Sequence, residues 1–266
     1  MRFRFKTILE ISAGLSAGIT AGVLAYNRIN NEVKALEKPT FPSKLPCTGL
    51  ECPVTRWDPN WDLRNCESSS NDLKMERNII LIRHGQYENH AQTEEKMVLT
   101  ELGKQQSMAV AKRLKTLNLP YRSIQTSRMI RAAETAKIIQ NELGKIELGF
   151  TNNLKEGIPS HCIPPVPGWD YEDGILYTDS QRCEYSFRQL FHRLTKPKGP
   201  TFEIVVCHAN LIRFFLCRAL QFPPEAWIRF SIPNCSMTWI TIHGNGTVSA
   251  RCVGEHTFIP AHMLTF

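Results

Sequence analysis

From residue 78 onward the sequence alternates short apolar runs with longer stretches of helical spacing, and this alternation restricts the fold more than any other feature. Short runs rich in β-branched residues are typical of strands, and the longer periodic stretches are typical of helices. The predicted strands span 78–82, 122–125, 146–150, 203–207, 236–242 and 247–253. The predicted helices span 100–117, 127–143, 179–194 and 210–220, with Thr100 and Ser127 as caps of the first two. Strands that alternate with helices imply a mostly parallel sheet covered on both faces, so we predict an α/β fold.

Two of the predicted strands lead directly into a histidine. The run at 78–82 is followed by Arg83, His84 and Gly85, and the run at 203–207 is followed by His208. Ligands of open parallel sheets bind beyond the carboxyl ends of the strands. Gly85 permits a sharp turn there, which lets two neighbouring side chains reach the same ligand. We therefore expect both histidines at one rim of the sheet.

Arginine and histidine together suit the transfer of a phosphoryl group. A neutral imidazole is a nucleophile at physiological pH, and a guanidinium matches the oxygens of a phosphate. Arg131 follows another predicted strand and supplies a second guanidinium beside Arg83, while Asn89 and helix N-termini can add neutral donors. Because phosphoryl transfer depends mainly on positioning and charge compensation, we expect neither a cofactor nor a protein-bound metal.

Taken in order, these elements resemble the histidine phosphatase superfamily, the clan of phosphoglycerate mutase. The Arg-His-Gly signature stands at 83–85 with its Asn at Asn89, the Leu-Thr-x-x-Gly element at 99–103, the Ser-x-x-x-Arg-Ala-x-x-Thr element at 127–135, the acid loop at 154–157 and the second histidine at His208. The resemblance runs from about residue 78 to the end and implies a phosphoglycerate mutase-like fold. It implies that His84 is the nucleophile and Glu156 the proton donor. The phosphoryl group would be held by Arg83, Asn89, Arg131 and His208.

Residues 1–28 have the composition of a membrane anchor. Residues 8–26 are apolar apart from Glu10, and basic residues flank them on both sides. A bilayer-spanning helix needs about 20 such residues. Gly14, Gly18 and Gly22 fall on one helical face, where two helices can approach closely. A cleaved secretory signal and a mitochondrial targeting segment have similar compositions, so both alternatives stay open.

Residues 29–76 are rich in proline and serine and have the composition of a tether without a core of its own. Within them lies the motif Trp-Asp-Pro-Asn-Trp-Asp at 57–62, which we call the WDPNWD motif. Its two tryptophans have no local core to enter. They either fold back onto the catalytic domain, predicted at 77–266, or dock on another chain, since tryptophan often dominates the energy of interfaces.

A narrower resemblance links the chain to mitochondrial serine/threonine protein phosphatases of the superfamily. It rests on the N-terminal segment, the WDPNWD motif and the segments 206–213 and 217–225. It implies a single-pass anchor in a mitochondrial membrane, phosphoprotein substrates, and homo-oligomers (dimers and higher) whose assembly activates the enzyme. The residues implied in assembly are Trp57, Asp58, Asn60, Trp61 and Asp62. The loop after Glu156 is shorter than in these relatives, which leaves substrate preference open.

Composition excludes several other classes of protein. The net charge of +7 is spread over the chain without a basic block or zinc-finger spacing, so we expect no nucleic-acid partner. The cysteines of the folded part include no Cys-x-x-Cys pair and indicate buried free thiols in a reducing compartment. Two alternatives to a protein phosphatase remain: a phosphoglycerate mutase-type enzyme acting on small molecules, and a catalytically silent membrane scaffold.

Overall fold

The computed structural model describes residues 57–64, 75–167, 171–194 and 199–266. The predicted anchor at 1–28 and the linker up to residue 56 lie outside these residues. Among the helices that the structure does describe, none is long and apolar enough to cross a bilayer. The described residues belong to one compact unit, Pro53–Phe266.

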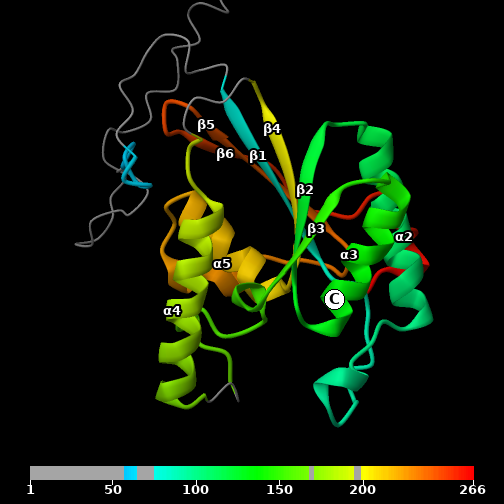
Figure 1. The fold of residues 1–266 in the computed structure, drawn as a ribbon. Coiled ribbons are helices and arrows are strands. Elements are labelled where there is room, and N and C mark those ends of the chain that lie inside the picture. The colour runs from blue at the N-terminus through cyan, green and yellow to red at the C-terminus, as the bar shows by residue number, and fades with distance from the viewer. Residues whose placement is uncertain (1–56, 65–74, 168–170, 195–198) are drawn as a thin grey trace, which may run out of the picture. The chain divides into compact units, whose positions relative to one another are not determined.

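The centre of this unit is a six-stranded sheet in the order β3-β2-β4-β1-β5-β6 (Figure 1). The strands are β1 (Glu76–Arg83), β2 (Tyr121–Ser127), β3 (Glu147–Thr151), β4 (Thr201–Cys207), β5 (Met237–His243) and β6 (Val248–Glu255). The first four are mutually parallel, whereas β5 and β6 form an antiparallel hairpin at one edge. This arrangement confirms the predicted α/β sheet, and each predicted strand coincides with an observed one.

Helices cover both faces of the sheet (Figure 1). They are α2 (Glu101–Leu117), α3 (Ile130–Leu143), α4 (Asp173–Leu190) and α5 (Ala209–Ala219). Short 3-10 helices lie at Glu94–Lys96, Asn152–Leu154, Pro224–Arg229 and Ala261–Met263. Helices α2 and α3 pack on one face with Ile80 and Ile82, while α4 and α5 pack on the other with Ile79 and Leu81. Alternate residues of β1 thus enter opposite cores, as the two-residue repeat of a strand requires.

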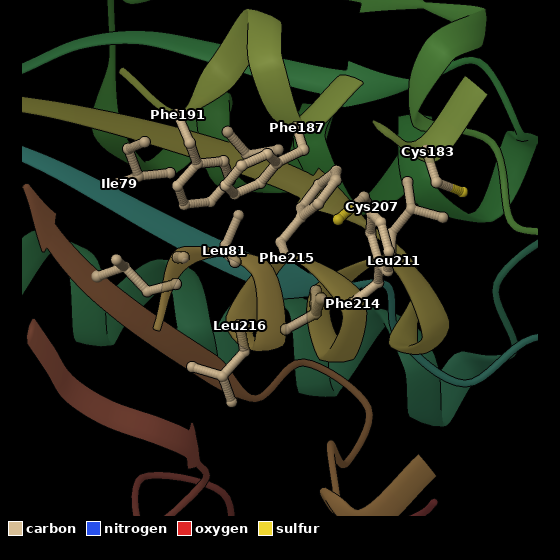
Figure 2. Close-up of a cluster of buried hydrophobic side chains, with 14 of the residues drawn as sticks. Ile79, Leu81, Cys183, Phe187, Phe191, Cys207, Leu211, Phe214, Phe215 and Leu216 are labelled. Carbon is tan, nitrogen blue, oxygen red and sulfur yellow. The ribbon is translucent and has the colours of Figure 1, made fainter. Parts of the chain in front are cut away.

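The core beneath α4 and α5 is aromatic (Figure 2). Phe187 of α4 and Phe191, the first residue after α4, stack with ring centroids 4.9 Å apart, and the Phe191 ring centroid lies 5.4 Å from that of Phe215 of α5. Burying rings of this size contributes about 2 kcal/mol each, and the paired geometry adds to it. Helix α4 is therefore held firmly against α5 and the sheet.

Two predicted helix boundaries were wrong. Ser127 is not the cap of α3, because it is the last residue of β2 and the helix begins at Ile130. Helix α4 spans Asp173–Leu190 instead of 179–194. Its first turns are mostly exposed and carry no apolar repeat, and beyond Leu190 the chain leaves the helix so that Phe191 can enter the core. Thr100 does cap α2, since its hydroxyl accepts the Gly103 N–H at 3.0 Å.

Candidate active site

The two predicted site histidines lie next to each other at the carboxyl ends of β1 and β4. These strands are paired in parallel, with Arg83 opposite Cys207, and the His84 N–H donates to the Cys207 carbonyl at 3.0 Å. The centroids of the His84 and His208 rings are 5.0 Å apart. Both rings are buried. The sheet therefore brings together two imidazoles that are far apart in the sequence.

Hydrogen bonds define the state of the His84 ring. Its Nδ1 lies 2.8 Å from the Gly85 carbonyl, and because a carbonyl only accepts, Nδ1 carries the proton. Nε2 keeps its lone pair and accepts from Arg131 Nε at 3.3 Å. Burial lowers the pKa of His84 well below its usual range, and the charges of Arg131 and Arg83 lower it further. The ring is a neutral imidazole whose lone pair is on Nε2, the tautomer that a nucleophile needs.

Several nitrogens around His84 are buried without a protein partner. Arg83 Nε, Arg131 Nη1 and His208 Nδ1 have no hydrogen-bond partner among the residues that the structure describes. Buried N–H groups in proteins almost always find a partner. Two guanidinium donors and a ring nitrogen in one place, beside positive charge, fit the oxygens of a phosphoryl group.

Glu156 lies in the loop after β3 and lines the same cavity as Arg83. This cavity of about 460 Å³ also contacts Arg213 and Arg229. Burial raises the pKa of Glu156 to about 7, against the opposing hydrogen bond from the Gly157 N–H and the charges of nearby arginines. A carboxyl with this pKa is part protonated near neutral pH, so it can both give and take a proton there.

Sequence reasoning missed four residues that contact this site or its loops. The Tyr87 ring packs edge-on against His84 at 5.2 Å and lies 4.5 Å from the Arg131 guanidinium. The Ser127 hydroxyl, read as a helix cap, lies 3.0 Å from His208 Nε2. The buried Asn234 donates to the His84 carbonyl at 2.9 Å. Arg182 of α4 binds the loop that carries Glu156.

Signals for two of these residues were present in the motifs. Ser127 opens the Ser-x-x-x-Arg element, and Tyr87 follows the Arg-His-Gly signature. Asn234 and Arg182 carry no local signal, because only the fold brings them near the site. Arg213 donates to the Phe230 carbonyl and to the Asn210 side chain, and it also lines the cavity.

Asn89 is a predicted phosphate ligand for which the described residues show no contact with the rest of the site. It lies in an exposed turn beyond Tyr87, and it forms no hydrogen bond with the described residues. Its role in phosphate binding stays a prediction.

The WDPNWD motif packs on the catalytic unit of its own chain. Trp61 Nε1 donates to the Gly246 carbonyl at 2.8 Å, and its ring lies 6.0 Å from Phe187. Asp62 is buried against Arg193, which donates through its backbone N–H at 2.8 Å and through its guanidinium. Burial raises the pKa of Asp62, but the hydrogen bonds of Arg193 outweigh this and leave that pKa lowered. Of the two alternatives left open, folding back is the one seen in the single chain.

Comparisons with known proteins identify the family of the chain. The profile of the histidine phosphatase superfamily (branch 1) matches residues 79–158 and 181–253. The Caenorhabditis elegans protein "Serine/threonine-protein phosphatase Pgam5, mitochondrial" is 41% identical over 236 residues, covering 80% of this chain and 82% of its own. Its Drosophila persimilis counterpart is 38% identical over 260 residues, covering 89% and 86%.

Solved structures share the fold. Phosphoglycerate mutase from Plasmodium falciparum superimposes with a TM-score of 0.50 at 31% identity, over 70% of this chain and 92% of that one. The Bacillus stearothermophilus protein YhfR gives a TM-score of 0.54 at 21% identity, over 69% and 100%, which bears on the fold alone. A profile match over more than half of the sequence, and relatives of this identity over most of it, show that the chain belongs to the histidine phosphatase superfamily.

Proposed function

We propose that the protein is a serine/threonine protein phosphatase that works through a phosphohistidine on His84. The observation that carries the proposal is the neutral His84 ring, whose Nε2 lone pair lies beside the guanidinium of Arg131. The reaction class follows from the superfamily, and the substrate class follows from the C. elegans and Drosophila relatives, which are named as serine/threonine protein phosphatases.

In the first step, the Nε2 lone pair of His84 attacks phosphorus and an N–P bond forms. The bond between phosphorus and the serine oxygen breaks, and its electron pair stays on that oxygen. Protonated Glu156 gives its proton to the oxygen, so serine leaves as an alcohol. Arg83, Arg131 and His208 compensate the charge of the transferring group, and Asn89 adds a neutral donor if its turn closes on the substrate.

In the second step, water replaces the histidine. The Glu156 carboxylate takes a proton from the attacking water, a new O–P bond forms, and the N–P bond breaks with its electron pair returning to Nε2. Inorganic phosphate leaves, and both His84 and Glu156 regain their starting states. A carboxyl whose pKa is about 7 suits both steps at neutral pH.

A phosphoglycerate mutase-type reaction is the second candidate, because the P. falciparum mutase shares the fold at 31% identity. A mutase returns the phosphoryl group to a small acid and keeps water away from phosphohistidine. The test assays the purified chain on phosphoserine and phosphothreonine peptides and on 3-phosphoglycerate, as wild type, as H84A and as R122Q. Arg122 is exposed near the start of β2, whereas Ser127 ends that strand beside the site. R122Q therefore serves as the control for a change remote from the site.

The wild type and R122Q should hydrolyse the peptides, and H84A should lose at least about 10⁴-fold in kcat, as nucleophile deletions do. Transfer of the phosphoryl group within 3-phosphoglycerate, with the peptides untouched, would assign the mutase reaction instead. Equal peptide hydrolysis by H84A and wild type would remove His84 as nucleophile. A wild type that turns over neither substrate would point to the scaffold.

The proposal includes a single-pass anchor in a mitochondrial membrane. It is supported by the apolar segment at 8–26 and by the word mitochondrial in the names of the relatives. Fractionation of the full chain from cells checks it: the protein should stay with mitochondrial membranes after carbonate extraction, and deletion of residues 1–28 should release it. Full-length protein in the carbonate supernatant would contradict the anchor.

The proposal also includes assembly through the WDPNWD motif. The Trp61 and Asp62 contacts described above join the motif to residues of α4, Arg193 and the β5–β6 turn, and a second copy offers the same residues. Exchange of the motif between copies is a low-cost route to oligomers. Light scattering with activity assays should show that W61A and D62N reduce both mass and kcat. Unchanged mass in both variants would restrict the motif to its own chain.

A further inference from the structure

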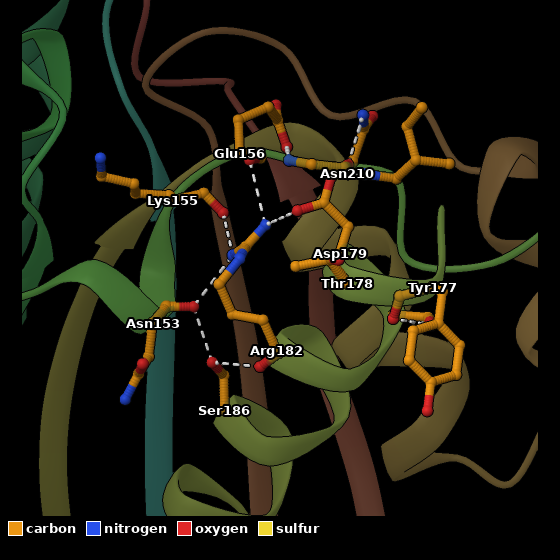
Figure 3. A network of polar contacts seen from close by, with 12 residues as sticks. Asn153, Lys155, Glu156, Tyr177, Thr178, Asp179, Arg182, Ser186 and Asn210 are labelled. Carbon is orange, nitrogen blue, oxygen red and sulfur yellow. Dashed lines mark hydrogen bonds and ion pairs between the residues drawn. The ribbon is translucent and has the colours of Figure 1, made fainter. Parts of the chain in front are cut away.

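One arginine side chain donates to three backbone carbonyls of the loop that carries Glu156 (Figure 3). Arg182 of α4 donates from Nη1 to the Lys155 carbonyl at 2.6 Å and to the Asn153 carbonyl at 3.2 Å. From Nη2 it donates to the Glu156 carbonyl at 3.1 Å. Because three carbonyls of residues 153–156 meet one planar guanidinium, the path of this backbone follows the orientation of Arg182.

Asp179 fixes that orientation from one turn earlier in α4. Its carboxylate accepts from Arg182 Nη2 at 2.7 Å, and its other oxygen accepts the Ile158 N–H at 2.9 Å. The two side chains are 19% and 20% exposed, so solvent competes little for these bonds. Arg182 and Asp179 together bind the loop before and after Glu156, and we call this pair the acid-loop clamp.

The helix that carries the clamp is firmly packed, and the loop backbone lies very close to the clamp side chains. Helix α4 is held by the stack of Phe187 and Phe191 described above. The Ser186 hydroxyl adds a bond to the Asn153 carbonyl at 2.7 Å. A Cβ on Gly157 would lie 2.3 Å from Arg182 Nη2 and 2.4 Å from Asp179 Oδ2, so only glycine lets the loop approach the clamp this closely.

The clamp binds the backbone of Glu156 and leaves its side chain to the cavity. Within the described residues, the Glu156 carboxyl has a weak bond from the Gly157 N–H at 3.3 Å, and Glu156 N–H points to Met129 Sδ at 3.3 Å. Neither contact restrains the carboxyl as strongly as the clamp restrains the backbone. Displacement of this loop by about 1 Å is enough to cost on the order of 100-fold in rate when a proton must be delivered to one atom.

We propose that Arg182, oriented by Asp179, is a positioning residue that holds the Glu156 carboxyl where it can protonate the leaving oxygen. This inference rests on the proposed phosphatase function and adds residues on α4 that touch neither the substrate nor phosphorus. It predicts a selective defect. A serine oxygen needs a proton to leave, whereas the nitrophenolate of p-nitrophenyl phosphate is stable as an anion and leaves without one.

The test measures kcat/KM for a phosphoserine peptide and for p-nitrophenyl phosphate in matched variants. R182K keeps the charge but loses the planar fork, D179N removes the charge that orients the arginine, E156Q removes the acid, and R122Q is the surface control. With peptide, R182K and D179N should lose on the order of 10- to 100-fold, and E156Q roughly 10²- to 10⁴-fold. With p-nitrophenyl phosphate each should stay within about threefold of wild type.

The double variant R182K/E156Q separates positioning from general destabilisation. If Arg182 acts through Glu156, the double variant should be no slower on peptide than E156Q alone. Equal losses on both substrates, full peptide activity in R182K and D179N, or additive losses in the double variant would overturn the proposal. Thermal unfolding identifies any variant that fails to fold, and the more conservative D179N then decides the question.

The same variants distinguish a failure of the clamp proposal from a failure of the proposed phosphatase function. If E156Q shows the selective defect and the clamp variants do not, the clamp proposal fails and the phosphatase function stands. If E156Q itself hydrolyses peptide at the wild-type rate, the assignment of Glu156 as the acid is wrong, and the clamp proposal falls with it while the phosphatase function stands. If the wild type hydrolyses no peptide, the proposed function itself fails.

Discussion

The rim that carries His84 and His208 and the loop that carries Glu156 belong to one site but are built differently. The rim follows two paired central strands. His84 is fixed by one backbone bond to the Cys207 carbonyl and by the contact of its own ring with the Gly85 carbonyl. The loop is held from outside the sheet by side chains of α4, with one further bond from Asn210 of α5 to the Gly157 carbonyl. The nucleophile is therefore as stable as the sheet, whereas the acid depends on a few side-chain bonds that can change without unfolding the protein.

A change at the rim should affect every substrate, and apart from loss of the nucleophile itself the largest rim effect is expected from R131Q. Arg131 lies beside His84 Nε2 and offers donors to the phosphoryl group that all substrates share. Loss of its charge should lower kcat/KM roughly 10³-fold for both a phosphoserine peptide and p-nitrophenyl phosphate. Steady-state kinetics on the two substrates checks this. A defect confined to the peptide would contradict a shared rim and assign Arg131 to the leaving-group side.

A change in the loop should instead discriminate between substrates, and G157A is the sharpest case. Its Cβ would clash with the ends of the Arg182 and Asp179 side chains, so either these side chains or the loop must shift and the clamp contacts are lost. The kcat/KM of the peptide should fall about 100-fold, while the kcat/KM of p-nitrophenyl phosphate, which reports the steps up to departure of nitrophenolate, should stay within about threefold of wild type.

Gly149 provides the control for G157A. It lies in β3, and an added Cβ would meet Gln125 at an ordinary 3.8 Å. G149A should leave the kinetics of both substrates unchanged. Matching losses in G149A and G157A would show that any glycine replacement in this region disturbs the site, and the contrast between rim and loop would then lose its support.

The pH dependence should separate the two regions in the wild-type protein. Below about pH 7 the Glu156 carboxyl is protonated and can serve as the acid, and above it the proton is lost. The kcat/KM of the peptide should therefore fall about tenfold per pH unit above pH 7. The lowered pKa of His84 keeps the nucleophile neutral over this range, so it adds no loss there.

Two comparisons make the pH experiment decisive. The kcat/KM of p-nitrophenyl phosphate should be flat above pH 7, and E156Q should be flat with both substrates. A parallel fall for both substrates in the wild type would place the titrating group at the rim and contradict the assignment of Glu156.

The smallest effect is expected from S127A. The Ser127 hydroxyl lies 3.0 Å from His208 Nε2 and orients a ring that already lies against the sheet. Loss of one hydrogen bond of this kind corresponds to about 1 kcal/mol, or about fivefold in kcat/KM, equal for both substrates. T178A, at an exposed position of α4, should have no effect. A peptide-selective loss in S127A would link the rim to proton transfer and weaken the distinction between the rim and the loop that carries Glu156.

The same contrast explains how much the sequence could predict. The rim was predictable because apolar runs end directly in Arg83, His84 and His208, and parallel strands carry such residues to one edge. Glu156 was found only through its place in a family motif, since nothing near it in the sequence indicates a raised pKa. The cause is burial in a cavity whose walls come from distant segments.

Local sequence patterns could not predict the roles of Arg182 and Asp179, which act from helix α4. Arg182 and Asp179 belong to a polar face of α4 whose start was itself predicted six residues too late. On sequence grounds they are an ordinary i, i+3 ion pair of a solvated helix, worth a few tenths of a kcal/mol. Only the packing of α4 beside the acid loop gives them three carbonyls and one N–H to bind.

The most direct test of the central claim is to trap the intermediate. A phosphoserine peptide carrying labelled phosphate is mixed with excess enzyme and quenched in alkali within milliseconds, and the protein is digested for mass spectrometry and phosphorus NMR. Because the Gly85 carbonyl holds the proton on Nδ1, the label should be on Nε2 of His84, and H84A should carry none. Label on another residue or on Nδ1, or turnover without any labelled enzyme, would contradict this account.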